Sequence, residues 1–361
     1  MAGRFALWEP NRPLDLNAFL RRHGALLAVV VVVVVLLGKE FHDKGAAVFW
    51  QLFVGGMTLG SVYALIALGY SMVYGILKLL NFAHGDVYMI GAFIGYGMIT
   101  AFGGPGNLAV SVWVLIVVMF VVSMVGTGFL GIVIERFAYR PLREAPRIAP
   151  LISAHGVSFF LQNSALLLFG ASIRTYNSFG LGSPNPESGL PGPLFKTVFT
   201  ISTVPVLRAQ ILVVVVGLML MLALTVLVQR TQLGKAMRAT AYDREAAGMM
   251  GIDTDRVIAS TFFIGSALAG AAGVMYGLVF SSIFHFMGFQ AGLKGFTAAV
   301  VGGIGSIPGA MVGGIVVGLA ETFAQGYVSG NWANLIVFGI LIVVMLVRPT
   351  GLFGAGVVQK V

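Results

Sequence analysis

The sequence predicts an all-α polytopic membrane protein, with about eight transmembrane helices, a broken or re-entrant segment near the C-terminus, and both termini in the cytoplasm. Two observations predict the class. Of the 361 residues, 58% are hydrophobic and only 10% are charged, whereas soluble domains are about 25% charged. Stretches of about 20 residues without charge also recur along the chain, which is the length that crosses a bilayer.

These stretches place the spans at roughly 23–38, 46–70, 85–103, 108–134, 148–170, 209–229, 257–281 and 332–347. Bulky and polar residues follow the first span, so no small-residue cleavage site is evident and we interpret it as retained rather than as a signal peptide. The predicted organisation is a polar N-terminal extension at 1–22, a transmembrane domain at 23–354 and a C-terminal tail at 355–361.

Orientation follows from the distribution of lysine and arginine, because short basic segments stay in the cytoplasm. Four segments hold most of the basic residues: the N-terminus with Arg4, Arg12, Arg21 and Arg22, loop 135–147 with Arg136, Arg140, Arg143 and Arg147, loop 230–256 with Arg230, Lys235, Arg238, Arg244 and Arg256, and the C-terminus with Arg348 and Lys360. The 38-residue loop 171–208 has three. We therefore expect it to be extracytoplasmic, where it either contacts an external partner or covers the mouth of the protein.

The segment 296–325 is interrupted by glycine and proline between Gly302 and Gly309. Such residues argue against one straight helix. A segment that enters and leaves on the same face would keep the C-terminus in the cytoplasm. Irregular backbone at membrane depth survives only where protein or a water-filled cavity satisfies it, so we expect Gly302, Gly303 and Gly305 near a pathway. The alternative is a pair of short full spans joined by a tight turn.

A second polar break lies at Asn81, Ala83, His84, Gly85 and Asp86, between two apolar runs. Ionisable groups inside a membrane are costly and are therefore candidates for function. We expect this break to line the pathway; the alternative is an interfacial turn in which the aspartate caps the next helix. The other ionisable residues at membrane depth are Lys78, His155 and Glu321.

Pairs of glycines spaced four apart allow helices to approach closely. They are Gly91/Gly95, Gly273/Gly277, Gly309/Gly313 and Gly314/Gly318. We expect packing within one subunit, with a subunit interface as the alternative.

Several functional classes lack support in the sequence. No catalytic motif, no metal-ligand spacing and no phosphate-binding GxxxxGK[ST] loop is present, so we predict no catalytic residues, no metal and no cofactor. Any ATP that drives this protein would be bound by a partner subunit. The net charge of +9 is spread over loops without a basic, aromatic-studded face, which does not suggest nucleic acid as a partner.

Loop 230–256 is the most specific feature of the chain. Good helix formers run from Thr240 to Met250 and Gly251 suits a helix stop. Asp253, Thr254 and Asp255 can then cap the next span. The triplet Glu245, Ala246 and Ala247, followed by Gly251, offers a small surface on which another protein could dock in the cytoplasm. The alternative is a solvated charged loop.

Over about 46–354 the chain resembles the permease subunits of bacterial ATP-binding cassette importers for branched-chain amino acids, of the LivH type. The resemblance is carried by Gly60–Leu65, Asn81–Asp86, Gly234–Ala239 with the Glu245 loop, Val301–Ala310 and Arg348–Gly354. It implies that 23–354 is a permease domain and that Glu245, Ala246, Ala247 and Gly251 couple it to an ATPase.

The resemblance further implies a set of partners and a location. The partners are two ATPase subunits, a second homologous permease, an extracytoplasmic substrate-binding protein, a small-molecule substrate and the lipid bilayer. The location is the bacterial cytoplasmic (inner) membrane. Related permeases carry urea, short amides or small organic acids, so these substrates stay open. A different class, a standalone secondary transporter or channel, would use His84, Asp86 or Glu321 as ion sites.

Overall fold

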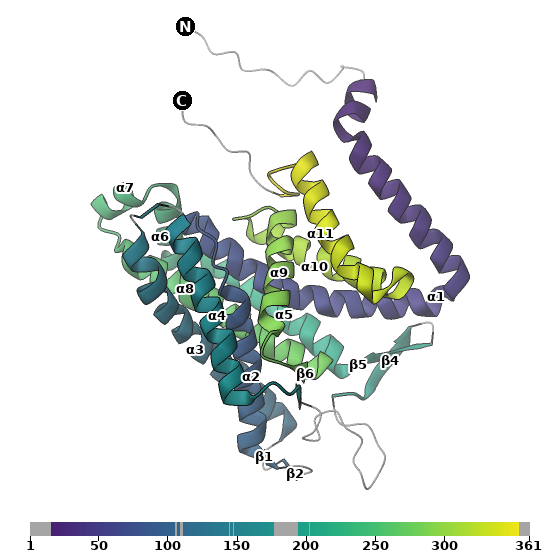
Figure 1. The fold of residues 1–361 in the computed structure, drawn as a ribbon, viewed down its shortest axis with the longest axis horizontal. Helices are drawn as coiled ribbons and strands as arrows, with labels where there is room; N and C mark the ends of the chain where they lie inside the picture. Colours follow the sequence, from purple (N-terminus) through teal and green to yellow (C-terminus); the bar gives the residue numbers. More distant parts are fainter. Residues whose placement is uncertain are drawn as a thin grey trace.

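The computed structural model describes residues 16–104, 107–108, 111–143, 145–146, 148–176, 194–201 and 203–353, with side chains in the first helix from Gly45 onward. Four predicted segments lie wholly or largely outside the described side chains: the extension 1–22, the span 23–38, the tail 355–361 and most of loop 171–208. In the described part, the chain is a helical membrane protein, as predicted (Figure 1).

Eight of the described helical segments are long and apolar enough to cross a bilayer. They are the Gly45–Leu77 part of α1 (Leu16–Leu77), α2 (His84–Phe102), α3 (Val112–Ile134) with its extension to Leu142, α4 (Ile148–Phe169), α5 (Arg208–Arg230), α8 (Thr254–Phe280), α10 (Ile307–Phe323) with its extension to Val328, and α11 (Gly330–Val347). Gly45, at φ 82°, interrupts α1. Seven of the eight coincide with predicted spans; the eighth, α10, falls in the segment predicted to be broken.

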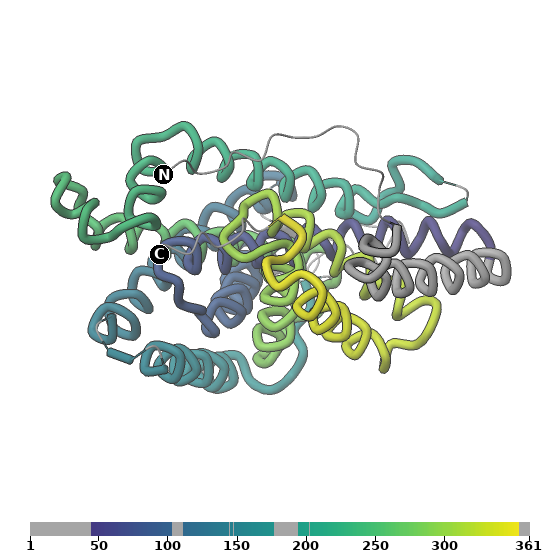
Figure 2. Tube along the Cα trace, turned by 90° about the horizontal axis from the view of Figure 1, so that it is seen from above, coloured from purple at the N-terminus to yellow at the C-terminus, as the bar shows by residue number. Residues whose placement is uncertain are grey.

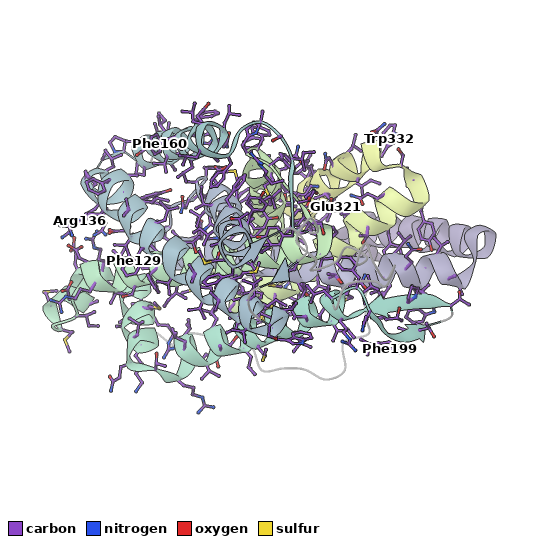
Figure 3. All side chains as sticks on the ribbon, turned by 90° about the horizontal axis from the view of Figure 1, so that it is seen from below. Phe129, Arg136, Phe160, Phe199, Glu321 and Trp332 are labelled. Atoms are coloured by element: carbon purple, nitrogen blue, oxygen red, sulfur yellow. The ribbon has the colours of Figure 1, made fainter. Side chains whose placement is uncertain are left out.

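The helices divide into a central and a peripheral group. The apolar windows of α1 and α8 are 72% and 78% buried, whereas those of α5 and α11 are 22% and 17% buried. Figure 2 shows α1 crossing the middle of the molecule with other helices on both sides. On the outside, Phe129, Phe160 and Trp332 point away from the protein, as their labels in Figure 3 show. Exposed apolar side chains on these outer helices suit contact with lipid.

Three short antiparallel strand pairs gather at one end of the molecule, which we call the strand end (Figure 1). They are β1 (Gly103–Gly104) with β2 (Asn107–Leu108), β3 (Arg174–Thr175) with β6 (Ser282–Ile283), and β4 (Thr197–Ile201) with β5 (Val204–Leu207). The β3–β6 pair joins the link after α4 to the link after α8, so the two helices end at the same level.

The opposite end, which we call the basic end, brings together the turn at 78–83, loop 135–147, loop 230–256 and residues 348–353. Tyr139 donates a hydrogen bond to the Leu80 carbonyl (3.0 Å), and Arg143 pairs with Asp255 (2.5 Å). Described basic residues at this end are Lys78, Arg136, Arg140, Arg143, Arg230, Lys235, Arg238, Arg244, Arg256 and Arg348, against Arg174, Lys196 and Arg208 at the strand end. The described basic residues are therefore distributed as the sequence predicted.

The segment predicted to be broken forms a helical hairpin. α9 (Met287–Gly302) runs to the basic end, a turn at 303–306 reverses the chain, and α10 returns to the strand end. The hairpin follows α1 from the Phe49–Phe323 ring contact (5.5 Å) to the contact of Gly75 with Gly305. The hairpin thus begins and ends at the strand end. The helix that follows it therefore starts on the side that the sequence predicted. Neither a re-entrant segment nor the alternative of two full spans is confirmed, since α9, with 16 residues, is not among the eight helices long enough to cross a bilayer.

Glycines hold α10 against α1. A Cβ built on Gly318 would lie 2.3 Å from the backbone of Gly60, and one on Gly314 would lie 2.3 Å from the Cα of Ala64. Because these neighbours are backbone atoms, they cannot move aside as a flexible side chain would. The four-residue spacing of these glycines therefore serves packing within the subunit, as we expected.

Candidate functional site

The first predicted break separates α1 from α2. Lys78 adopts a left-handed conformation (φ 56°) just after α1 ends, and α2 begins at His84. The Asn81 carbonyl accepts the His84 N–H (3.1 Å), and the Ala83 carbonyl accepts the N–H of Asp86 (3.0 Å). Backbone carbonyls therefore organise the start of α2.

Asp86 does not cap α2 with its side chain, contrary to one of our two interpretations. It lies in the first turn, buried, and its carboxylate accepts hydrogen bonds from Ser158 (2.5 Å) and Gln162 (3.1 Å) of α4. The carboxylate thus joins α2 to α4 instead of stabilising the helix start. No local pattern pointed to these partners, because they lie more than 70 residues away in the chain.

The rest of this break is also buried. Ala83 is fully buried, and Gly85 packs against the backbone of Gly288 and Gly292 on α9. His84 lies so close to Gly69 that a Cβ there would meet its Nε2 at 2.2 Å. Within the described residues, His84 Nε2 and Asn81 Nδ2 have no hydrogen-bond partner. Buried polar atoms without partners are uncommon and often mark a position where water or a ligand binds.

The second predicted break is the turn between α9 and α10. Gly302 packs against the backbone of Gly309, while Gly303 and Gly305 adopt positive φ angles of 110° and 88° that favour glycine. The N–H groups of Leu352 and Phe353 donate to the carbonyls of Val301 and Gly302, both at 2.9 Å. The C-terminal segment thus satisfies the irregular backbone of this turn.

An aromatic group closes the space between the polar break and α9. Tyr70 and Phe82 each place a ring about 6 Å from Phe296 (6.0 and 6.2 Å between centroids), and His155 lies 4.6 Å from Phe82. The cavity that these side chains line is only about 10 Å³. In this structure these side chains therefore leave no room for a small molecule in this space.

The loop at 230–256 folds into two helices, α6 (Gln232–Tyr242) and α7 (Arg244–Met249). The single helix predicted from Thr240 to Met250 is therefore wrong. Asp243 takes an extended conformation, and its carboxylate accepts the N–H of Ala246 (3.0 Å), so that it starts a new helix.

The end of α7 is as predicted. Gly251 has a φ of 85°, and the N–H of Ile252 donates to the Ala247 carbonyl (3.1 Å), which is a glycine-terminated helix stop. Asp253 then caps α8 by accepting the Arg256 N–H (3.1 Å). Both features position α7 at the tip of the basic end.

α7 presents an exposed surface at its tip. Glu245 is exposed, whereas Ala247 is buried against the chain itself. Tyr242, Met249 and Met250 are about 80% exposed (79, 83 and 83%). Large apolar side chains this exposed, next to a carboxylate and away from the spans, form a surface suited to binding another protein.

A buried ionic cluster, which the sequence did not predict, supports this tip. Arg143 pairs with Glu135 and with Asp255, and both Arg143 and Glu135 are nearly buried (6% and 4% of the side chain exposed). Arg140 reaches the same Asp255 from a more exposed position (2.5 Å, 46% exposed). The cluster fixes the link after α3 to the start of α8.

A cavity of about 350 Å³ with polar residues in its wall lies nearer the strand end, between α1, α9 and α10. Glu321 lies in its wall, in the interior of the molecule (Figure 3). Lys294 Nζ lies 2.6 Å from Glu321 Oε1, Gln325 donates to the same oxygen (3.1 Å), and Tyr63 donates to Oε2 (2.9 Å). Sequence analysis identified Glu321 but missed Lys294, which fell between two predicted segments.

None of these groups forms an evident metal site. In the part of the chain that the structure describes, no three His, Asp or Glu side chains are grouped to hold a metal ion.

Residues 52–346 match the family described as "Branched-chain amino acid transport system / permease component". The chain is 44% identical over 313 residues to the high-affinity branched-chain amino acid transport system permease protein LivH of Escherichia coli, covering 87% of this chain and 98% of that protein. It is 43% identical to BraD of Pseudomonas aeruginosa with the same coverage. LivM of Escherichia coli is 25% identical over 323 residues, covering 85% of this chain and 72% of LivM. No solved structure matches.

Proposed function

The chain belongs to the family of branched-chain amino acid transport permeases, and from this premise we propose that it forms the translocation pathway of an ATP-driven importer for branched-chain amino acids. The observation that carries the proposal is the identity of 44% across 98% of LivH. The exposed tip of α7 supports it, because a carrier that works alone has no need of a docking surface.

The direct test is uptake in a bacterium that lacks its own branched-chain amino acid permeases. We expect labelled leucine, isoleucine and valine to enter only when this chain is expressed with its ATPase and binding-protein partners. Uptake should stop when the ATPase cannot hydrolyse ATP. Uptake of urea or short amides instead would change the substrate class. Uptake without any ATPase, driven by a proton gradient, would make the protein a secondary transporter.

The proposed assembly contains two ATPase subunits, a second permease and an extracytoplasmic binding protein, in the bacterial inner membrane. LivM, itself named as a permease, is similar over most of this chain. We therefore propose a homologous rather than an identical partner permease. In this assembly ATP is bound and hydrolysed by the partners, and this chain is not an enzyme.

Reversal of charge at Glu245 tests the docking surface. Glu245→Arg should uncouple ATP hydrolysis from uptake and weaken co-purification of the ATPase, since a docking contact of a charge pair is worth about 2–5 kcal/mol when buried in the interface. Gln232→Arg, also exposed but at the start of α6, is the control and should have little effect. Normal coupling in Glu245→Arg would remove α7 from the ATPase interface.

The basic end is proposed to face the cytoplasm, with both termini on that side. Reporter domains fused after Pro184 and after Val361 should report opposite sides of the membrane. The reason is the excess of lysine and arginine at the basic end. If the two fusions report the same side, the number of crossings between them is even, contrary to this proposal. A cytoplasmic report after Pro184 with an external report after Val361 would reverse the orientation.

The two breaks are proposed to line the inner part of the pathway. Because the chain has no cysteine, Ala83→Cys and Gly303→Cys can be labelled without background from this chain. Both positions are buried here, so we expect slow labelling in this state and faster labelling when ATP turnover opens the basic end. Val117→Cys, exposed on the outside of α3, should not respond to nucleotide. Equal labelling of Ala83→Cys and Gly303→Cys in all nucleotide states would place the pathway elsewhere.

A further inference from the structure

We propose that the cavity around Lys294 and Glu321 binds the charged groups of a free amino acid, with Lys294 taking the carboxylate and Glu321 taking the ammonium group. The proposal rests on the function proposed above and names a subsite within it.

The cavity contains one positive and one negative side chain, both largely buried. Lys294 and Glu321 form an ion pair of 2.6 Å whose side chains are only 12% and 4% exposed. Separating a buried pair is strongly unfavourable, because each charge then lacks a partner. A zwitterion avoids this cost, since its carboxylate replaces Glu321 beside Lys294 while its ammonium group replaces Lys294 beside Glu321. A ligand with a single charge that separates the pair leaves one buried charge uncompensated, and a neutral ligand that separates it leaves both.

Neighbouring groups hold the carboxylate of Glu321 in position. Tyr63 and Gln325 donate to its two oxygens, at 2.9 and 3.1 Å, from α1 and from the end of α10. Charge-assisted hydrogen bonds of this kind are stronger than neutral ones and fix geometry. Glu321 therefore keeps its place when Lys294 turns toward a ligand.

The remainder of the cavity suits an aliphatic side chain. Leu59, Phe280, Phe284 and Met287 contribute apolar surface to the same cavity. The volume of about 350 Å³ is at the lower end of the range of roughly 300–1,000 Å³ for small-molecule sites. Polar and apolar groups both contribute to the wall, as an amino acid with a charged backbone and an aliphatic side chain requires.

The cavity and the aromatic group lie at different levels along α1 and α9. Tyr63 and Lys294 line it, whereas Tyr70 and Phe296, further along the same two helices, line the closed space of about 10 Å³ nearer the basic end. Met287, Gln290 and Lys294 face the cavity, whereas Phe289, Gly292 and Phe296 face the closed space, so the two spaces lie on different faces of α9.

Protection of a single cysteine from modification tests the subsite. The probe position is Gln290→Cys, which is exposed in the cavity wall, and the control is Thr200→Cys, which is exposed on β4 outside it. The complex of permeases and ATPases is reconstituted in lipid nanodiscs without binding protein and treated with a small thiol reagent. Labelling is read on this chain alone after separation of the denatured subunits.

Leucine at about ten times its dissociation constant should slow labelling of Gln290→Cys roughly tenfold. Leucine amide, which lacks the carboxylate, and 4-methylpentanoate, which lacks the ammonium group, should not protect at the same concentration. Thr200→Cys should label at the same rate with and without leucine. Equal protection by all three compounds would show that binding in the cavity does not require both charges of the ligand, and would overturn the proposal.

Substitutions of the pair separate binding from a purely structural role. Lys294→Met and Glu321→Gln should each abolish protection by leucine. Because these single variants can also fail to fold, the exchange Lys294→Glu with Glu321→Lys keeps an ion pair in place. It should restore the amount of folded complex but not the protection, since the ligand would have to bind reversed, with its side chain away from the apolar wall. Full protection in the exchange variant would mean that the pair only balances charge.

The outcomes for the subsite and for the proposed function are distinct. Leucine uptake by the wild-type complex without protection of Gln290→Cys overturns the subsite and leaves the function standing. Protection that depends on both charges, in a complex that imports no leucine, supports the subsite and contradicts the function.

Discussion

Gly318→Leu should abolish accumulation of the folded protein. Gly318 lies where α10 crosses α1, and a Cβ there would stand 2.3 Å from both Cα and N of Gly60. A leucine would have to push two helix backbones apart along a contact that extends from Phe49 to Gly75. Overpacking of a well-packed interior costs about 1–3 kcal/mol and occasionally more, and we expect the upper end because no side chain can yield.

The measurement is the yield and thermal half-life of the detergent-solubilised chain on a sizing column. Gly339→Leu is the matched control, since no atom lies within 4 Å of the position of its Cβ in α11. That variant should be as stable as wild type or more so, because glycine costs a helix up to about 1 kcal/mol relative to other residues. Wild-type yield and half-life in Gly318→Leu would show that α1 and α10 are not packed as described.

Arg143→Met should destabilise the basic end by about 3–5 kcal/mol, the usual effect of removing one partner from a buried ionic cluster. The substitution leaves Glu135 buried without its cation and removes the buried link between loop 135–147 and the start of α8, where only the more exposed Arg140–Asp255 pair remains. We expect a lower unfolding temperature of the purified complex and, because α7 precedes α8, weaker coupling to the ATPase.

Two further variants sharpen this prediction. Arg140→Met removes a partner of the same Asp255 but from a side chain that is 46% exposed, so it should cost at most about 1 kcal/mol. The double variant Arg143→Met with Glu135→Leu replaces the buried pair by apolar groups and should recover much of the lost stability. Equal effects of Arg140→Met and Arg143→Met would show that burial does not distinguish the two arginines.

The sequence predicted those elements that depend on interactions between residues close together in the chain. Charge-free stretches located the spans, Gly251 ended a helix, and Asp253 started the next, because each depends on residues within one or two turns. The split at Asp243 was missed for an instructive reason. Alanine and methionine on both sides favour a continuous helix. The hydrogen bond that the Ala246 N–H donates to the Asp243 carboxylate instead stabilises a new helix start. Helix propensity alone does not show which of the two effects prevails.

The pairing of the charged groups in the candidate site could not be predicted, because their partners are distant in sequence. Lys294 and Glu321 are 27 residues apart and meet only because α9 and α10 form a hairpin. Asp86 and Ser158 are 72 residues apart. A polar residue within an apolar stretch indicates that a partner exists, but the packing of the helices decides which residue it is.

α8 connects the exposed tip of α7 to the Lys294–Glu321 cavity. At one end it follows α7 directly, and at the other Tyr276 and Phe280 form part of the wall of the Lys294–Glu321 cavity. Its 27 residues make a rod of about 40 Å. A rod of that length that pivots near one end by about 5° moves its other end by about 3–4 Å. In the proposed assembly α8 would serve as a lever arm, which converts a small rotation of α7 into a displacement large enough to reshape the cavity wall.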